Sequence, residues 1–411
     1  MNARALALAA LAEWRKGRQF ADAVLQTFLA RSRLTGSDRG FATELFYGVL
    51  RNLTLLDFWI AQLRSADLDD ETRDLLRLGI YQIAFLNTAS HAAVNETVTL
   101  APPRARGLTN AILRNAQRRR AELEGAAAKA PRHVRLSHPE FLVRKWDQQF
   151  GPDATLELCL WNNRPAPIYV RVNELQISVS DFLQKYAGAV VVPENNRFVT
   201  LPEPWAAVAA GDGYVQDPST TVAPELLASG ADETVLDACA APGGKTGYIA
   251  QLMQNRGTLV ACDRDARRLE VLRQNLQTLG VRNAQVVQHD WSKDSLGELS
   301  RFQFDRVLID APCSNTGVMR RRVDVRWRLQ PGDFTRMPDA QLEIVRAALP
   351  LLKPGGVLVY STCSIEPEEN DRVIEGLLRE FPFMRRDEEK SMLPFRDHFD
   401  GAFAAKVVRD G

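Results

Sequence analysis

The 411-residue chain contains few cysteines, and their arrangement excludes two common roles. Cysteine occurs five times, an odd number, and no two cysteines form a Cys-x-x-Cys pair; the five are Cys159, Cys239, Cys262, Cys313 and Cys363. A disulfide framework and a structural zinc site both depend on regularly spaced cysteines. We therefore expect free thiols, no metal and a reducing, cytoplasmic location.

The chain also lacks long apolar runs and a large net charge. No run approaches the roughly 20 apolar residues that a helix needs to cross a bilayer, so no membrane association is expected. Arg4 and the Ala/Leu run ending at Ala12 superficially resemble a signal peptide. The run is alanine-rich and its leucines have helical spacing, which favours the first helix of a soluble domain. With a formal net charge of +1, only local patches can hold a phosphate-bearing partner.

Two basic patches are present. The first consists of Arg104, Arg106, Arg114, Arg118, Arg119, Arg120, Lys129, Arg132, Arg135, Arg144 and Lys145. Charge runs are commonly solvated surface, and that interpretation stays open for this patch. The second runs from Arg320 to Arg328 around Trp327. It would grip an RNA backbone while Trp327 stacks on a base, unless Trp327 belongs to the core.

Hydropathy patterning divides the chain into three expected domains. Residues 1–125 show apolar side chains at helical spacing and predict an all-helical domain. An alanine- and proline-rich stretch near residues 126–131 is interpreted as a linker. Residues 137–214 predict a small α+β connector with a strand at 168–173. Residues 215–411 alternate short apolar strands with helices, which is typical of a Rossmann-like, mostly parallel, doubly wound α/β sheet.

Ligands of such sheets bind at the carboxyl ends of the strands. The expected strands are residues 234–237, 258–262, 285–287, 306–310 and 357–360. The first strand enters a loop whose glycines let the backbone approach a ligand. This loop is Cys239, Ala240, Ala241, Pro242, Gly243, Gly244 and Lys245. A Walker phosphate loop is excluded, because it requires glycine where this chain has Cys239.

Acidic residues at successive strand ends indicate a nucleoside cofactor. Asp263 follows the second strand and is suited to accept hydrogen bonds from both ribose hydroxyls. Asp290 follows the third strand and is suited to contact the adenine or its amino group, and Asp310 ends the fourth strand. One such acid is commonly a surface or capping residue, but three at three strand ends favour a ligand site.

Two of the cysteines lie 50 residues apart in similar positions. Cys313, in DAPCS (310–314), and Cys363, in STCS (361–364), each follow an expected strand. A free thiol is commonly a buried small hydrophobe, and we interpret Cys159 and Cys262 in that way. Two thiols in one site suggest chemistry on a pyrimidine: a thiolate adds to C6 of cytosine and activates C5, and a second group helps to reverse the addition. The target base must be single-stranded or flipped out.

Three motifs together resemble one enzyme family. They are CAAPGGK (239–245), DAPCS with the TG pair at 316–317, and STCS followed by PEEN at 367–370. The set resembles the S-adenosylmethionine-dependent RNA cytosine-5 methyltransferases of the Sun/Fmu (RsmB) type, and the match extends from residue 216 to GAFAAK at 401–406. HAAVNE (91–96) and LTNAILR (108–114) resemble the NusB-like RNA-binding domain of the small-subunit ribosomal RNA branch.

The resemblance implies a reaction and roles for the site residues. The cofactor would be S-adenosyl-L-methionine, bound by residues 239–245, Asp263, Asp290 and Asp310, and the substrate a cytosine in a hairpin loop of 16S rRNA, by resemblance position 967. Cys363 would be the nucleophile and Cys313 would assist breakdown of the covalent intermediate. Asp310 is also suited to bind the N3/N4 edge of the cytosine, and Lys245 to neutralise charge. We expect a monomer.

Alternatives and departures from the family pattern stay open. The substrate would otherwise be tRNA or 23S rRNA, or the chain would be a non-catalytic RNA-binding assembly factor. An adenine-N6 methyltransferase would show an Asn/Asp-Pro-Pro-aromatic strand end where this chain has DAPC. The family often has glycine at Asn315 and His-Pro at residues 322–323, which affects the shape of the loop. Pro367 predicts a helix beginning just after Cys363, and a helix N-terminus favours a thiolate.

Overall fold

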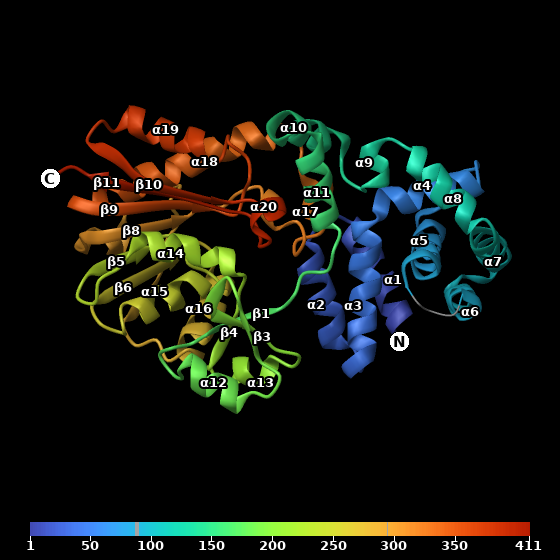
Figure 1. Cartoon of the computed structure of the whole chain (residues 1–411), viewed down its shortest axis with the longest axis horizontal. Coiled ribbons are helices and arrows are strands. Elements are labelled where there is room, and N and C mark those ends of the chain that lie inside the picture. Colours follow the sequence, from blue (N-terminus) through green and yellow to red (C-terminus); the bar gives the residue numbers. More distant parts are fainter. Residues whose placement is uncertain (87–89, 294) are drawn as a thin grey trace. The chain divides into compact units, whose positions relative to one another are not determined.

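The computed structural model describes residues 1–86, 90–293 and 295–411. The chain forms two compact units (Figure 1). Unit 1 comprises Met1–Pro165 and Met319–Leu329, and unit 2 comprises Ala166–Val318 and Gln330–Gly411. Within the described ranges, no helix combines the length and the apolar character needed to cross a membrane.

Unit 1 is helical, as the spacing of its apolar residues predicts. Its helices are α1 (Ala3–Arg15), α2 (Ala21–Arg31), α3 (Gly36–Arg51), α4 (Leu53–Leu63), α5 (Asp70–Phe85), α6 (Ser90–Leu100), α7 (Pro103–Arg118), α8 (Arg120–Lys129), α9 (Arg132–Arg135), α10 (Glu140–Phe150), α11 (Pro152–Asn162) and α17 (Val325–Arg328). Leu45, Phe46 and Val49 lie on one face of α3 and are fully buried. Side chains also fix helix ends: Asn2 caps α1 and accepts a hydrogen bond from the Ala5 amide.

The interpretation of residues 126–131 as a linker is wrong. Its alanines continue helix α8 to Lys129, and Ala127 packs into the helical core. Alanine has the highest helix propensity, so an alanine-rich stretch remains helical when a neighbouring core can bury it. Pro131 then provides the turn before α9. The helices that open residues 137–214, α10 and α11, belong to unit 1, whereas the strands of that stretch belong to unit 2.

Unit 2 contains two sheets. The smaller sheet has the order β2-β3-β1-β4 and consists of β1 (Tyr169–Val172), β2 (Val190–Val192), β3 (Asn195–Thr200) and β4 (Gly213–Val215), with helices α12 (Val179–Lys185) and α13 (Trp205–Ala209). The larger sheet has the order β10-β11-β9-β8-β5-β6-β7. Its strands are β5 (Thr234–Asp237), β6 (Thr258–Asp263), β7 (Ala284–Gln288), β8 (Phe304–Asp310), β9 (Leu352–Thr362), β10 (Met384–Met392) and β11 (Ala402–Arg409).

The larger sheet confirms the predicted Rossmann-like fold. Strands β5 to β9 pair in parallel, whereas β11 runs antiparallel to β9 and β10 antiparallel to β11. Figure 1 shows helices on both faces; they are α14 (Val222–Leu227), α15 (Gly244–Leu252), α16 (Ala266–Thr278), α18 (Asp333–Ala348) and α19 (Asp371–Glu380). Neighbouring Val235 and Leu236 of β5 enter different core clusters, because successive side chains of a strand point to opposite faces.

Candidate active site

The carboxyl ends of three parallel strands bring the candidate residues to one edge of the larger sheet. The chain passes from β5 to β6 and β7 on one side and then returns to β8 on the other side of β5. Such a switch point opens a crevice at the strand ends. Asp237 ends β5 and Asp310 ends β8, and Asp310 lies opposite Ser361 of β9. The loop after β8 carries Cys313, and the loop after β9 carries Cys363.

The two cysteines meet in space. Their Sγ atoms are 3.3 Å apart, and both residues are partly exposed. The hydrogen bond with Cys363 and burial together raise the pKa of the Cys313 thiol well above its ordinary value, so Cys313 keeps its proton. Cys159 and Cys262 are buried, and burial raises the pKa of the Cys159 thiol to about 12. These two have the structural role that the sequence predicts.

A lysine–aspartate pair lies at the same edge. Lys245 Nζ is 2.6 Å from Asp310 Oδ2, and Ser361 donates a hydrogen bond to Asp310 Oδ1 over 3.3 Å. Burial lowers the pKa of Lys245, but the charge and hydrogen bond of Asp310, with a contribution from Cys363, raise it overall. Lys245 is therefore a fixed positive charge close to Cys363.

Glu369 joins the two cysteine loops, although the sequence does not single it out as a site residue. It is fully buried. Its Oε2 accepts hydrogen bonds from the Ser314 amide at 2.8 Å and from Gln341 Nε2 at 2.9 Å. Its Oε1 accepts from the Ser364 hydroxyl at 2.8 Å. Ser314 follows Cys313 and Ser364 follows Cys363, so one carboxylate holds both loops.

The prediction that a helix begins at Pro367 is wrong. Residues 367–370 form turns, and α19 begins at Asp371. The side chains that would open such a helix have other partners: Asn370 accepts from the Thr362 hydroxyl at 2.6 Å and donates to the Ser364 carbonyl at 2.9 Å. These bonds fold the segment back onto the Cys363 loop. The positive charge that acts on Cys363 from this site is a side chain, Lys245, whose pKa Cys363 helps to raise.

The glycine loop and the acids follow the neighbouring strands as predicted. Gly243 has a φ of +108° in the turn that opens α15, a conformation that glycine adopts without strain. Asp263 ends β6 and is buried; its Oδ2 lies 3.2 Å from Nη1 of Arg268, which also donates to the Ala241 carbonyl. Asp290 follows β7 and is partly exposed, and hydrogen bonds from Ser292 lower the pKa of its carboxyl.

Comparisons with known proteins cover nearly the whole chain. Family models match at residues 1–118 (NusB family), 138–199 (ferredoxin-like domain of RsmF/B-like methyltransferases) and 224–408 (16S rRNA methyltransferase RsmB/F). A probable ribosomal RNA small subunit methyltransferase B of Bacillus subtilis is 32% identical, covering 94% of this chain and 90% of that protein. The ribosomal RNA small subunit methyltransferase B of Vibrio cholerae is 36% identical, covering 92% of each. The chain belongs to the RsmB/F family of 16S rRNA methyltransferases.

A solved structure supports the same relationship. A methyltransferase homologue from Pyrococcus horikoshii is 31% identical, with a TM-score of 0.59, and the match covers 67% of this chain and 97% of that one. The RsmB/F family consists of S-adenosylmethionine-dependent RNA methyltransferases. The chain is therefore an S-adenosylmethionine-dependent rRNA methyltransferase, with a NusB-family region ahead of the Rossmann-like sheet.

The strand-end residues of this RsmB/F-family enzyme fit the cofactor. Asp237 is fully buried, its Oδ2 accepts from the Thr246 hydroxyl at 2.7 Å, and its Oδ1 has no hydrogen-bond partner among the described residues. A buried polar atom without a partner leaves a hydrogen-bonding position open to a ligand at this edge. Asp263 and Asp290 offer carboxylates to ribose hydroxyls and to an amino group. A ribose bound there would share Asp263 with Arg268.

In this RsmB/F-family enzyme, part of the second basic patch is structural rather than RNA-binding. Arg326 is fully buried in unit 1 and donates to Asn163 Oδ1 at 2.6 Å and to the Asn162 carbonyl at 3.0 Å. Trp327 donates from Nε1 to the Leu50 carbonyl at 2.9 Å. Trp327 is partly exposed, and this bond anchors the edge of its indole ring to unit 1, so stacking of its face on a base stays a prediction. Sequence could not show this, since the partners lie more than 150 residues away.

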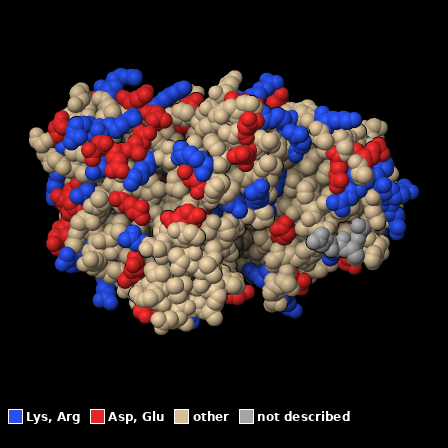
Figure 2. Space-filling view, viewed as in Figure 1, with Lys and Arg blue, Asp and Glu red and all other residues tan. Residues whose placement is uncertain are grey.

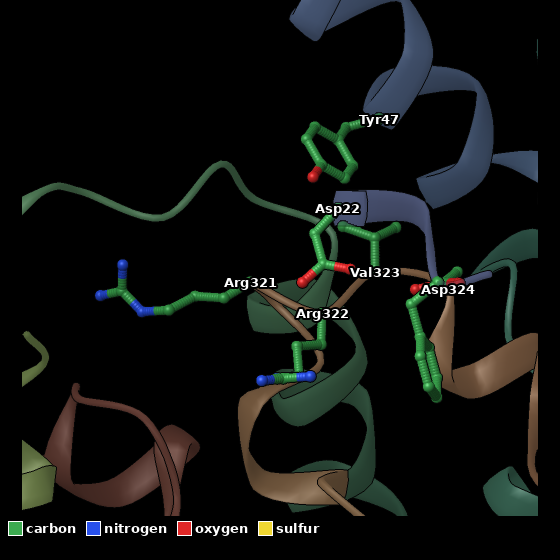
Figure 3. A pocket seen from close by; sticks show the side chains of 7 residues that line it. Asp22, Tyr47, Arg321, Arg322, Val323 and Asp324 are labelled. Atoms are coloured by element: carbon green, nitrogen blue, oxygen red, sulfur yellow. The ribbon is translucent and has the colours of Figure 1, made fainter. Parts of the chain in front are cut away.

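The same segment lines a pocket of unit 1. The lining residues are Phe20, Asp22, Tyr47, Arg321, Arg322, Val323 and Asp324. Figure 3 shows Asp22 and Asp324 near Val323, and the Arg321 side chain extending away from them. Asp324 Oδ2 accepts from the Ala21 amide at 2.9 Å and from Trp14 Nε1 at 3.1 Å. None of the residues predicted for methyl transfer lines this pocket.

The first basic patch is largely surface. Figure 2 shows Lys and Arg side chains gathered over α7 and α8. Several of its members have acidic partners: Arg119 pairs with Glu122 at 2.6 Å, and Arg120 with Glu124 at 2.8 Å. Such exposed pairs reduce the positive field that an RNA backbone would meet.

Proposed function

We propose that the protein methylates C5 of a cytosine in 16S rRNA through a covalent bond between Cys363 Sγ and C6 of the ring. The observation that carries the proposal is the 3.3 Å separation of the Cys313 and Cys363 sulfur atoms beside the Lys245–Asp310 pair. Relatives named as ribosomal RNA small subunit methyltransferase B support rRNA as the substrate, and position 967 in a hairpin loop is the site that we propose.

The nucleophile is Cys363. It loses its proton to solvent, and the positive charge of Lys245 stabilises the thiolate that forms. The thiolate attacks C6 of a cytosine that is flipped out or single-stranded, an Sγ–C6 bond forms, and the electron pair of the C5–C6 double bond moves to C5. Asp310 holds the N3/N4 edge of the ring, where charge develops. Residues 239–245, Asp263, Asp290 and Asp310 would hold S-adenosylmethionine, which would supply an electrophilic methyl group for C5 and leave as S-adenosylhomocysteine.

Cys313 acts in the release of the product. Water accepts the C5 proton, the C–H electron pair restores the C5–C6 double bond, and the Sγ–C6 bond breaks. The Cys313 thiol, which keeps its proton, donates that proton to the departing Cys363 sulfur 3.3 Å away and regains one from solvent. The two cysteines therefore have different roles, because only one of them starts the reaction as a thiolate.

Single substitutions test this assignment with 16S rRNA and labelled S-adenosylmethionine. Cys363→Ala should abolish transfer, whereas Cys313→Ala should accumulate a protein–RNA adduct that resists denaturant. Cys159→Ala, which removes a buried thiol of unit 1, is the control and should retain turnover. Full turnover by Cys363→Ala, or a Cys313→Ala variant that releases product normally, would overturn the mechanism.

The substrate and the assembly state need separate tests. Bisulfite sequencing of 16S rRNA, 23S rRNA and tRNA from cells with and without the gene should show one lost 5-methylcytosine, in 16S rRNA; a loss in either other RNA would reassign the substrate. We further propose that residues 1–125 contact the RNA, that residues 137–214 connect this domain to the catalytic domain, and that residues 215–411 catalyse methyl transfer. We also propose that the protein is a cytoplasmic monomer. Light scattering should then give a mass near 45.9 kDa, and about twice that value would contradict a monomer.

A further inference from the structure

Asn315 occupies a special backbone position beside the two cysteines. Its φ is +58°, in the left-handed region, where glycine and asparagine are the residues most readily accommodated. Asparagine therefore fits this backbone position without the strain that most side chains would cause. Unlike glycine, however, asparagine adds a side chain with a donor and an acceptor to the loop.

The side chain of Asn315 contacts both cysteine segments. Its Nδ2 donates to the Cys313 carbonyl at 2.7 Å, and its Oδ1 accepts from Cys363 Sγ at 3.3 Å. The first bond fixes the orientation of the amide, because a carbonyl oxygen only accepts hydrogen bonds. Oδ1 must therefore face Cys363, and an oxygen in that position can pair with a thiol but not with a thiolate.

We propose that Asn315 is a positioning residue that holds Cys363 as a hydrogen-bonded thiol until the thiolate is required for attack on the RNA. The inference rests on the proposed role of Cys363 as the nucleophile. Forming the thiolate breaks the bond and leaves the Asn315 oxygen facing a negative sulfur. Asn315 thus fixes the position of Cys363 Sγ in the free enzyme and limits the reaction of this thiol with other electrophiles when no RNA is bound.

Two substitutions at this position should act in opposite directions. Asn315→Gly keeps the backbone conformation and removes the acceptor, so it should speed alkylation of Cys363 by about twofold to tenfold, the factor that corresponds to one ordinary hydrogen bond. Asn315→Asp keeps an oxygen near Cys363 and adds a negative charge, which opposes the thiolate. It should slow alkylation by a similar factor.

The measurement is the rate at which iodoacetamide modifies Cys363 in the full-length protein without RNA, followed by mass spectrometry of the Cys363 peptide at several pH values. The rising limb of methyl transfer against pH should move to lower pH in Asn315→Gly and to higher pH in Asn315→Asp. The matched control is Asn255→Gly: Asn255 has a φ of +57°, and its side chain bonds to Gly280 and Arg282. This variant should alkylate at the wild-type rate.

The outcomes separate this inference from the proposed function. Equal rates in both Asn315 variants and the wild type, or a change in the same direction in both, would overturn the role of Asn315. Turnover by Cys363→Ala would instead refute the nucleophile, whatever the alkylation rates are. If Asn315→Gly fails to fold, as judged by circular dichroism, Asn315→Asp alone decides the question, since slower alkylation supports the proposal and an unchanged or faster rate contradicts it.

Discussion

Replacing Glu369 tests whether one buried carboxylate holds the two cysteine loops together. Glu369 accepts three hydrogen bonds, from the Ser314 amide, the Gln341 amide and the Ser364 hydroxyl. In Glu369→Gln, the remaining oxygen can serve Ser314 and Gln341 while the new amino group donates to the Ser364 hydroxyl, which can rotate to accept. Only the charge assistance is lost, so the free energy of unfolding of unit 2 should fall by about 1–2 kcal/mol.

Glu369→Ala is expected to be more severe. It leaves two buried N–H donors, on Ser314 and Gln341, without an acceptor, and each such group costs about 1–3 kcal/mol. The total loss should therefore be about 2–6 kcal/mol. A displacement of about 1 Å at the sulfur atoms can lower a rate about 100-fold, so kcat for methyl transfer should fall strongly in the alanine variant and less in the glutamine variant.

The assays are urea denaturation followed by circular dichroism and methyl transfer at saturating RNA. Glu368→Gln is the matched control, since it makes the same change at the neighbouring position, where a partly exposed carboxylate lies 3.8 Å from the exposed Arg372; loss of this long pair should alter stability by less than about 1 kcal/mol. Equal stability and kcat in Glu369→Ala and Glu368→Gln would refute the reasoning that Glu369 holds both loops.

Three further predictions follow from single contacts. Burial raises the pKa of Asp237 to about 7, so folded unit 2 retains a proton that the unfolded chain releases above pH ~4. The free energy of unfolding should fall by about 3 kcal/mol as the pH rises from 4 to 7, and urea titrations of Asp237→Asn should lack this fall. Arg326→Met should destabilise unit 1 by about 1–3 kcal/mol in thermal unfolding and leave the salt dependence of RNA binding unchanged; a smaller salt dependence would restore an RNA-binding role. Lys245→Met should lower kcat at least about tenfold by loss of a charged hydrogen bond, whereas Lys353→Met, which removes the pair with Asp305 at the other end of β8, should not.

The parallel strands could be predicted, but the antiparallel edge could not. Strands β5, β6, β8 and β9 have apolar cores that must be buried by helices on both faces, so their sequences identify them, and β7 was identified by its apolar pair Val286–Val287. Strand β10 is exposed over residues 385–391 and rich in charge, because an edge strand needs no burial and charged side chains protect it from further pairing. Its only strand partner is β11 in the described sheet, and that pairing is invisible in a local pattern.

The sequence by itself determined which chemical groups are available and at which strand ends they stand. Local properties of the chain include the apolar strands that end in Asp237, Asp263 and Asp310. They also include Cys313 and Cys363, each of which lies in a loop directly after a strand. Local pattern was insufficient where a side chain has a distant partner. Glu369 and Asn370 bond to the cysteine loops instead of opening a helix, and the Trp327 indole donates to the Leu50 carbonyl.

Only the tertiary structure decided how these groups interact. The 3.3 Å separation of Cys313 and Cys363, the contact of Asn315 with Cys363 and the burial of Arg326 each depend on segments about 50 or more residues apart meeting in space. Hydrogen bonding and burial act on distance in the folded chain rather than on distance along it. The sequence therefore identifies the reactive groups. The fold determines which of them is held in place for the reaction, which keeps its proton, and which is buried in a structural role.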